Sequence, residues 1–364
     1  MNPKNENSEW QAWGASPISA TKLLERSVGV SPASSTSGQD ARAPVGLHLS
    51  EMRPQACGDT FNGGEVSRNE VVKSFGRLGL KRGDVVLVHS AMRTVGRVAG
   101  GASSIIDALL ELVGPTGTLV VPSYTFAHEA EADPIIDPRN DPAEMGIITE
   151  TARLRPDALR STAFRHSFAA IGRRAAVITG GDPALSVFDF RSAFGVMLGL
   201  NTQVILLGVT YTSSTSHHFA ELVCDVPYRQ TIPKVVRVRQ SDGNVVPQPM
   251  TDYQPKSSGG TYYGTRAPDF NRLGKMLEVQ EKVAMTFVGN AGVRRFAMRD
   301  LIDLAQAEAA ADFNIFRTPE GETEYLTPLD FGQCVMSPES VDGAGRPHCV
   351  QWCVQDIGRL QMPG

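Results

Sequence analysis

Residues 85–122 read VVLVHSAMRTVGRVAGGASSIIDALLELVGPTGTLVVP, and this stretch decides the fold. It opens with the apolar run Val85–Val88, which has the length of a strand, and closes with a second apolar run at 118–122. Between them, a loop ending in Gly100–Ser104 caps an amphipathic helix expected at 105–113. Two buried strands joined by a helix form a βαβ unit, which predicts parallel strands in an α/β sheet.

The same alternation of strands and helices continues on both sides of this unit. Further helices are expected at 67–78, 147–154 and 299–311, and further strands at 167–172 and 204–209. The segment 235–249 changes to short strands around the turn Ser241-Asp242-Gly243-Asn244, which indicates a β-hairpin. The predicted fold class is therefore α/β, a mixed and largely parallel central sheet flanked by helices, with a smaller inserted antiparallel element.

Composition divides the chain into a folded domain and two extensions. Residues 1–64 mix Ser, Gly, Pro and charges with little periodicity, and we expect them to be poorly ordered or appended. The domain is expected at 65–316, with the antiparallel insert at about 230–265. Residues 317–364 lose periodicity and are predicted to be an extension of unknown role.

The overall composition excludes several classes of protein. With 364 residues, 41% hydrophobic and 20% charged, the chain has the composition of a soluble globular protein. A formal net charge of −4 argues against a nucleic-acid partner, and apolar runs of strand length argue against a membrane span. Five scattered cysteines and a polar N-terminus indicate a cytoplasmic protein. The sequence does not predict the oligomeric state.

The strongest chemical signal follows the strand expected at 204–209. In a helix starting near Thr215, His218 and Glu221 lie three residues apart and share one face, so the carboxylate can orient the imidazole. Such a pair can accept a proton near neutral pH, and ligands of α/β sheets bind beyond the carboxyl ends of strands. The alternative is an ordinary contact on a solvated helix. His217 points away from Glu221 and is interpreted as a wall residue.

Cysteine and histidine residues in the tail invite a zinc interpretation. Cys334, His348, Cys349 and Cys353 lack the paired spacing of structural zinc sites, because Cys334 has no near partner. The spacing therefore favours no metal.

Several short motifs, taken in order, resemble the aminoglycoside 3-N-acetyltransferase family of coenzyme-A-dependent enzymes. The resemblance is collinear over about Ser67 to Ala311. Its marks are Val88-His89-Ser90, Val98–Ala102, Gly114–Pro122, Met145-Gly146, Arg160-Ser161, His166–Ala169, Leu207–Val209, Thr215 with His218 and Glu221, and Val226–Arg229.

The resemblance implies acetyl-CoA as the co-substrate and an amine as the acceptor, with direct transfer in a ternary complex. It assigns donor binding to His89 and Ser90 and to Gly100, Gly101, Ala102 and Ser103, whose backbone N–H groups suit phosphates or pantetheine amides. The alternative for Gly100 and Gly101 is a tight turn that binds no ligand. The alternative for His89 is a structural role in its loop.

The same resemblance implies that His218 is the general base, that Glu221 orients it, and that Thr215 donates to the oxyanion or anchors the thioester carbonyl. On the acceptor side we expect His166, Glu150, Asp189 and Asp225 to bind an aminoglycoside. A structural hydrogen bond is the alternative for His166.

The sequence departs from the family pattern on the acceptor side. Ala163-Phe164 stand where a His-Pro pair is usual, Ser214 replaces a common asparagine, and Ala193 replaces a proline. Two alternatives therefore remain open. One is a natural-product acyltransferase acting on another amine or acyl donor, and the other is a relative that binds coenzyme A without turnover.

Overall fold

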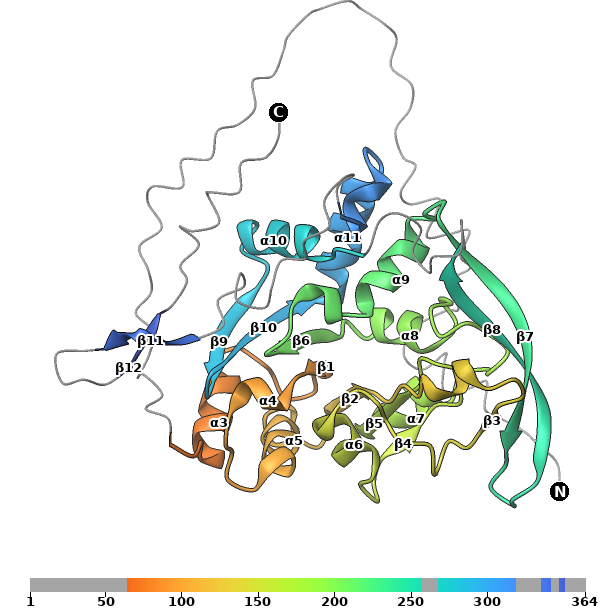
Figure 1. Ribbon diagram of the computed structural model, residues 1–364, viewed down its shortest axis with the longest axis horizontal. Coiled ribbons are helices and arrows are strands. Elements are labelled where there is room, and N and C mark those ends of the chain that lie inside the picture. The colour runs from red at the N-terminus through yellow and green to blue at the C-terminus, as the bar shows by residue number, and fades with distance from the viewer. Residues whose placement is uncertain (1–63, 257–267, 319–334, 342–346, 351–364) are drawn as a thin grey trace, which may run out of the picture. The chain divides into compact units, whose positions relative to one another are not determined.

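The computed structural model describes residues 64–256, 268–318, 335–341 and 347–350. Its main element is a seven-stranded sheet in the order β4-β5-β2-β1-β6-β10-β9, and a second sheet has the order β3-β7-β8 (Figure 1). The strands of these two sheets are β1 (Val85–Ser90), β2 (Thr118–Pro122), β3 (Ile135–Ile136), β4 (Leu159–Arg160), β5 (Phe168–Gly172), β6 (Gln203–Leu207), β7 (Arg229–Arg239), β8 (Val245–Pro255), β9 (Ala284–Val288) and β10 (Ala291–Ala297). Strands β11 (Val335–Val341) and β12 (Pro347–Val350) pair with each other.

Helices cover both faces of the seven-stranded sheet. The helices are α3 (Arg68–Gly76), α4 (Met92–Val95), α5 (Gly101–Val113), α6 (Ile147–Arg153), α7 (Ala175–Thr179), α8 (Ala193–Gly199), α9 (Ser216–Val223), α10 (Asn271–Val279) and α11 (Met298–Ala309), with short turns η2 (Ala127–Ala130), η3 (Tyr211–Ser213) and η4 (Phe313–Phe316). Side chains alternate along each strand, so Leu87 and Leu206 pack with α7 to α11, whereas Val86 and Ile205 pack with α3, α5 and α6. The predicted α/β class, a mixed sheet flanked by helices, is confirmed.

The parallel part of the sheet lies at its centre. Strand β1 pairs in parallel with β2 and β6, as the 85–122 unit predicts. The outer described pairs, β2 with β5, β5 with β4, β6 with β10 and β10 with β9, are antiparallel. Strand β5 reverses direction because the chain makes a long excursion after β2 and returns through the β4–β5 hairpin. The strand expected at 167–172 is therefore present as β5, but it pairs antiparallel with β2 and does not belong to the parallel part of the sheet.

The elements predicted from sequence begin and end close to their expected positions. Ser67 forms a capping box with Glu70 at the start of α3, and β2 spans Thr118–Pro122 as expected. The start of α5 differs, because the helix begins at Gly101 and not at 105. Gly100 is the N-cap residue, with a left-handed φ of 76°, so the helix starts four residues earlier than the apolar pattern indicated.

The expected antiparallel insert is the β7–β8 hairpin, which pairs from Arg229↔Pro255 to Arg239↔Val245. Its turn closes where Gln240 N donates to Asn244 O, and Gly243 has a φ of 89°. The extensions predicted at 1–64 and 317–364 lie almost entirely outside the described residues. Among the described helices, none is both long enough and apolar enough to cross a bilayer.

Candidate active site

A cavity of about 500 Å³ lies beyond the carboxyl ends of the parallel strands. Strands β1 and β2 lead into it through Ser90 and Tyr124, and the loop after β6 together with α9 contributes Thr215 and His218. The β7–β8 hairpin contributes Arg229 and Tyr253. Substrate sites in α/β sheets occupy this position, so the cavity is the candidate active site.

The turn after β6 depends on Gly208. This residue has a φ of 65°, and a side chain there would meet the hydroxyl of Thr94. Glycine alone adopts such a conformation without strain, so it allows the chain to turn sharply from the buried strand into the η3 loop. The turn brings the start of α9 to the cavity.

His218 and Glu221 meet on the first turns of α9, as their spacing predicts. Nδ1 of His218 lies 2.6 Å from Oε2 of Glu221. Glu221 is 1% exposed and its other oxygen accepts from the hydroxyl of Tyr228 at 2.9 Å. The His218 side chain is 17% exposed and lines the cavity. The carboxylate is thus held behind the imidazole, on the side away from solvent.

Arg229 is the third member of this arrangement, and its role was not predicted from the sequence. Its Nε forms an ion pair with Glu221 Oε2 at 2.5 Å, and its Nη2 lies 2.9 Å from His218 Nδ1. Nδ1 cannot both donate to Glu221 and accept from Arg229. Because an ionised carboxylate is an acceptor only, a separation of 2.6 Å requires the proton on Nδ1. Nε2 of His218 then carries the lone pair.

The surroundings of His218 keep its imidazole neutral. Burial lowers the pKa of His218 below 6.5, the charge of Arg229 lowers it further, and Glu221 opposes both effects. A histidine with a lowered pKa is unprotonated at neutral pH. Nε2 is therefore free to accept a proton.

Thr215 and Tyr124 form a pair of hydroxyl groups on the cavity wall. Thr215 is the N-cap residue of α9, yet its side chain does not cap the helix. Its Oγ1 lies 2.7 Å from the phenolic oxygen of Tyr124, which follows β2. The structure thus brings the predicted residues Thr215, His218 and Glu221 together and adds Tyr124 to them.

His166 also lines the cavity, as expected for a residue on the acceptor side. Its ring packs edge-on against Tyr124 at 4.9 Å and Phe188 at 5.3 Å between centroids. Burial, followed by the charge of Arg165, lowers its pKa well below 6.5. His166 therefore presents a neutral imidazole to the cavity.

The predicted donor residues are divided between the cavity and α5. His89 and Ser90, at the end of β1, line the cavity. His89 is buried, which lowers its pKa to about 3, and its Nε2 has no hydrogen-bond partner among the described residues. Gly100, Gly101, Ala102 and Ser103 form the start of α5 and do not line this cavity.

Three carboxylates predicted to bind the acceptor lie outside the cavity. Glu150 is paired with Arg153 at 2.5 Å and accepts from the backbone N–H of Ala143. Asp189 is paired with Arg191, and Asp225 is exposed in the turn after α9. The structure therefore does not bring Glu150, Asp189 or Asp225 to His218. Arg153 and Arg191 lie three and two residues from their partners, so these ion pairs are local, whereas the position of the carboxylates relative to the cavity depends on the fold.

The carboxylate that does line the cavity is Glu129 on η2. Its Oε1 lies 3.2 Å from Nη1 of Arg165, whose Nη2 donates to both oxygens of Asp252 at 2.8 and 2.7 Å. Arg165 is 5% exposed and ties the β8 strand to the cavity wall. The only sequence signal for Glu129 was its place in the loop after β2.

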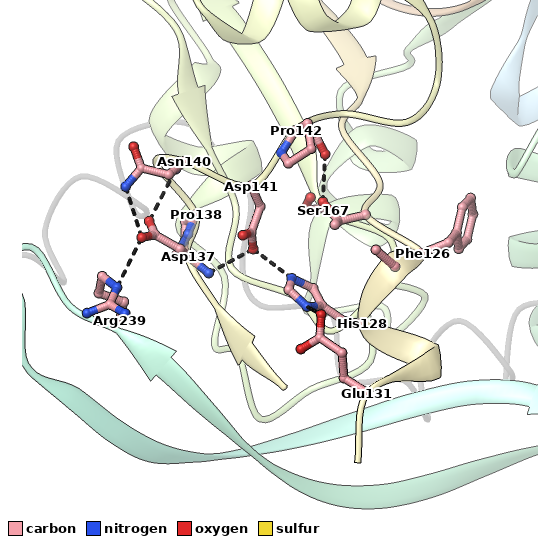
Figure 2. A network of polar contacts seen from close by, with 12 residues as sticks. Phe126, His128, Glu131, Asp137, Pro138, Asn140, Asp141, Pro142, Ser167 and Arg239 are labelled. Atoms are coloured by element: carbon pink, nitrogen blue, oxygen red, sulfur yellow. Dashed lines mark hydrogen bonds and ion pairs between the residues drawn. The ribbon is translucent and has the colours of Figure 1, made fainter. Parts of the chain in front are cut away.

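A polar network holds the loop that carries Glu129 (Figure 2). Oδ2 of Asp141 is 2.8 Å from Nε2 of His128 and accepts from the N–H of Asp137. Asp137 in turn is paired with Arg239 of β7 at 3.1 Å. The network joins η2, the following loop and the hairpin, so this wall of the cavity is fixed.

His217 is fully buried and stacks on Phe270 at 4.9 Å between ring centroids, and it does not line the cavity, so its interpretation as a wall residue is not supported. Across the described part of the chain, no group of three His, Cys, Asp or Glu residues is arranged to hold a metal ion. The side chains of Cys334, His348, Cys349 and Cys353 lie outside the described residues.

Comparison with known proteins identifies this protein of mixed α/β architecture as an acyltransferase and identifies its family. The model of the aminoglycoside 3-N-acetyltransferases matches residues 87–309. The chain is 31% identical over 271 residues to aminoglycoside N(3)-acetyltransferase IV from Salmonella sp, a match that covers 73% of this chain and 98% of the relative. The chain belongs to the aminoglycoside 3-N-acetyltransferase family.

Solved structures of relatives share this architecture. A mutant of aminoglycoside acetyltransferase AAC(3)-IVa in complex with a gentamicin superposes with a TM-score of 0.56 at 28% identity, covering 70% of this chain and 93% of the other. AAC-IIIb, solved as a binary complex with CoASH, has a TM-score of 0.61 at 22% identity and covers 71% of this chain and 100% of its own. Because AAC-IIIb is only 22% identical to this chain, its likeness supports the fold alone.

Proposed function

We propose that this protein transfers the acetyl group of acetyl-CoA to an amino group of an aminoglycoside antibiotic, the 3-amino group of the deoxystreptamine ring. One observation carries the proposal. His218 is held by Glu221 through Nδ1, which leaves Nε2 as a neutral base on the wall of the cavity. Membership of the family supports the type of reaction.

The proposed reaction is direct. The acceptor nitrogen forms a bond to the thioester carbon, its proton passes to Nε2 of His218, and the carbon–sulfur bond breaks to release the thiolate of coenzyme A. The proton on His218 then returns to the thiolate or to solvent. Glu221 stabilises the imidazolium while it exists, and Thr215 donates to the carbonyl oxygen as it gains negative charge.

On the donor side, Ser90 and His89 fit the thioester end of the substrate, because both line the cavity that holds His218. Gly100, Gly101, Ala102 and Ser103 are proposed to contact a more distant part of coenzyme A from the start of α5. Backbone N–H groups at a helix N-terminus suit phosphate oxygens. An acetyl donor agrees with membership of the aminoglycoside 3-N-acetyltransferase family.

On the acceptor side, the proposal places His166 and Glu129 in contact with the substrate. Both line the cavity, and Glu129 supplies a negative charge for an ammonium group. Glu150, Asp189 and Asp225 are proposed only for parts of the acceptor that extend beyond the cavity. Acetylation removes a positive charge that such drugs use to bind RNA phosphates, so the expected consequence is antibiotic resistance in the cytoplasm.

A second acceptor class has its own supporting observation. Among the described residues that line the cavity, Glu129 is the single carboxylate, and it already faces Arg165. A polycation would find little charge compensation there. A natural-product amine with fewer charges, or a different acyl donor, is therefore the alternative on the same scaffold.

The experiment is a thiol-release assay with acetyl-CoA and a panel of amines that includes deoxystreptamine aminoglycosides. Release with gentamicin-like acceptors, reduced about 10²- to 10⁴-fold in His218→Ala, is the expected result because general-base catalysis contributes that much. Release only with other amines would favour the second class. Undiminished turnover in a folded His218→Ala protein would overturn the proposed mechanism.

A further inference from the structure

Tyr124 lines the cavity, and the proposed mechanism gives its hydroxyl group no role. Its side chain is 2% exposed, and its phenolic oxygen lies 2.7 Å from Oγ1 of Thr215. Neither hydroxyl has another hydrogen-bond partner among the described residues. Both residues line the cavity that holds His218.

The position of Tyr124 is fixed by its backbone neighbours. Ser123 O accepts from Ser167 Oγ at 2.6 Å and from Arg160 Nη2 at 2.6 Å, and Tyr124 O accepts from the N–H of Glu144. The ring packs against Phe168 at 5.7 Å. The phenol is therefore held in place before any substrate binds.

Counting protons shows what the pair of hydroxyls offers to a ligand. Two O–H groups share one contact, so one proton lies between the oxygens and the other remains free. The phenol is the more acidic hydroxyl and hence the better donor, and burial raises the pKa of Tyr124, so it stays protonated. Tyr124 then donates to Thr215, and the Thr215 proton is the one left for the cavity.

We propose that Tyr124 is a positioning residue for the acyl-transfer reaction, which donates to Thr215 and so directs the Thr215 hydroxyl toward the carbonyl oxygen of the thioester. Thr215 and His218 lie three residues apart at the start of α9 and face the same cavity. The donor and the base therefore act on the two ends of one reaction, the carbonyl oxygen and the acceptor nitrogen. A donated hydrogen bond also polarises the hydroxyl that receives it, which strengthens its own donation.

This inference rests on the proposed function and goes beyond it. Tyr124→Phe keeps the ring and removes the hydroxyl, so we expect kcat to fall about five- to tenfold, the usual effect of one neutral hydrogen bond, with the KM for acetyl-CoA little changed. Thr215→Val should lower kcat by about 10²-fold or more, as expected for the loss of one oxyanion donor. In a Thr215→Val background, Tyr124→Phe should have no further effect, because its action passes through Thr215.

Tyr211→Phe is the matched control. Tyr211 is also fully buried and its hydroxyl donates to Glu278, but it does not line the cavity. Removal of the Tyr211 hydroxyl should leave kcat unchanged. Thermal unfolding of each variant separates a catalytic effect from a loss of structure.

A second measurement needs no acceptor. Acetyl-CoA labelled at the thioester carbonyl and bound to the wild-type protein should show a carbonyl stretch at lower frequency than free acetyl-CoA. Tyr124→Phe should move that band back toward the free position, and Tyr211→Phe should not. A band insensitive to Tyr124→Phe, or additive effects of the two substitutions on kcat, would overturn the inference while leaving the proposed function intact. Failure of acetyl-CoA to bind the wild-type protein would overturn both.

Discussion

Glu221 is the residue on which the geometry of the site depends. It is 1% exposed, and it faces His218, Tyr228 and Arg229 at once. The sequence predicted its contact with His218 because three-residue spacing on a helix is a local property. It did not predict Arg229, which comes from a different element and contacts Glu221 only after folding.

The pH dependence of activity follows from the lowered pKa of His218. The base works when neutral, so activity is present above this pKa and is lost as the pH falls through it. The acid limb of kcat/KM should therefore lie below pH 6.5. An acid limb above that value would contradict the assignment.

Arg229→Gln tests the cause of this shift. Removing the guanidinium removes a charge that lowers the pKa of His218, so the acid limb should move to higher pH. The measurement is kcat/KM against pH for the variant and the wild type. Arg155→Gln is the control, because it removes an ion pair with Asp107 and Arg155 does not line the cavity. It should leave the acid limb of kcat/KM at the same pH.

At the scale of elements, the turn after β6 decides whether α9 reaches the cavity. Gly208→Ala should destabilise the protein by about 1 kcal/mol or more, because φ is positive and the new methyl group would meet Thr94. Gly199→Ala is the matched control, since Gly199 ends α8 with open space around it. It should be neutral or stabilising by about 0.5–1 kcal/mol.

Urea unfolding measures both glycine variants. A lower free energy of unfolding for Gly208→Ala alone supports the role of the turn. Equal stabilities of the two variants would contradict it.

Local elements were predicted more closely than the long-range contacts between them. Strand β2 and the Ser67 cap have local causes, an apolar run and a capping box, and both were placed correctly. The direction of β5 was not predicted at all, because it depends on the path of the chain between 122 and 168. Glu150 and Asp189 pair with Arg153 and Arg191 of their own segments, so these ion pairs are local, whereas the position of the two carboxylates outside the cavity depends on the fold.

At the scale of the whole molecule, one cavity receives residues from the strand ends and from the hairpin, so donor and acceptor are expected to be bound together. Initial-rate lines at several acceptor concentrations should then intersect on a double-reciprocal plot. Acetyl-CoA alone should give no stoichiometric burst of thiol. Parallel lines together with a burst would indicate an acyl-enzyme and contradict direct transfer.

The central claim is that Nε2 of His218 is an unprotonated base while Nδ1 donates to Glu221. Nitrogen NMR of the labelled imidazole, with the signal assigned by His218→Gln, tests it most directly. At about pH 7 we predict a neutral ring with the proton on Nδ1. A doubly protonated ring, or a neutral ring with the proton on Nε2, would contradict the account.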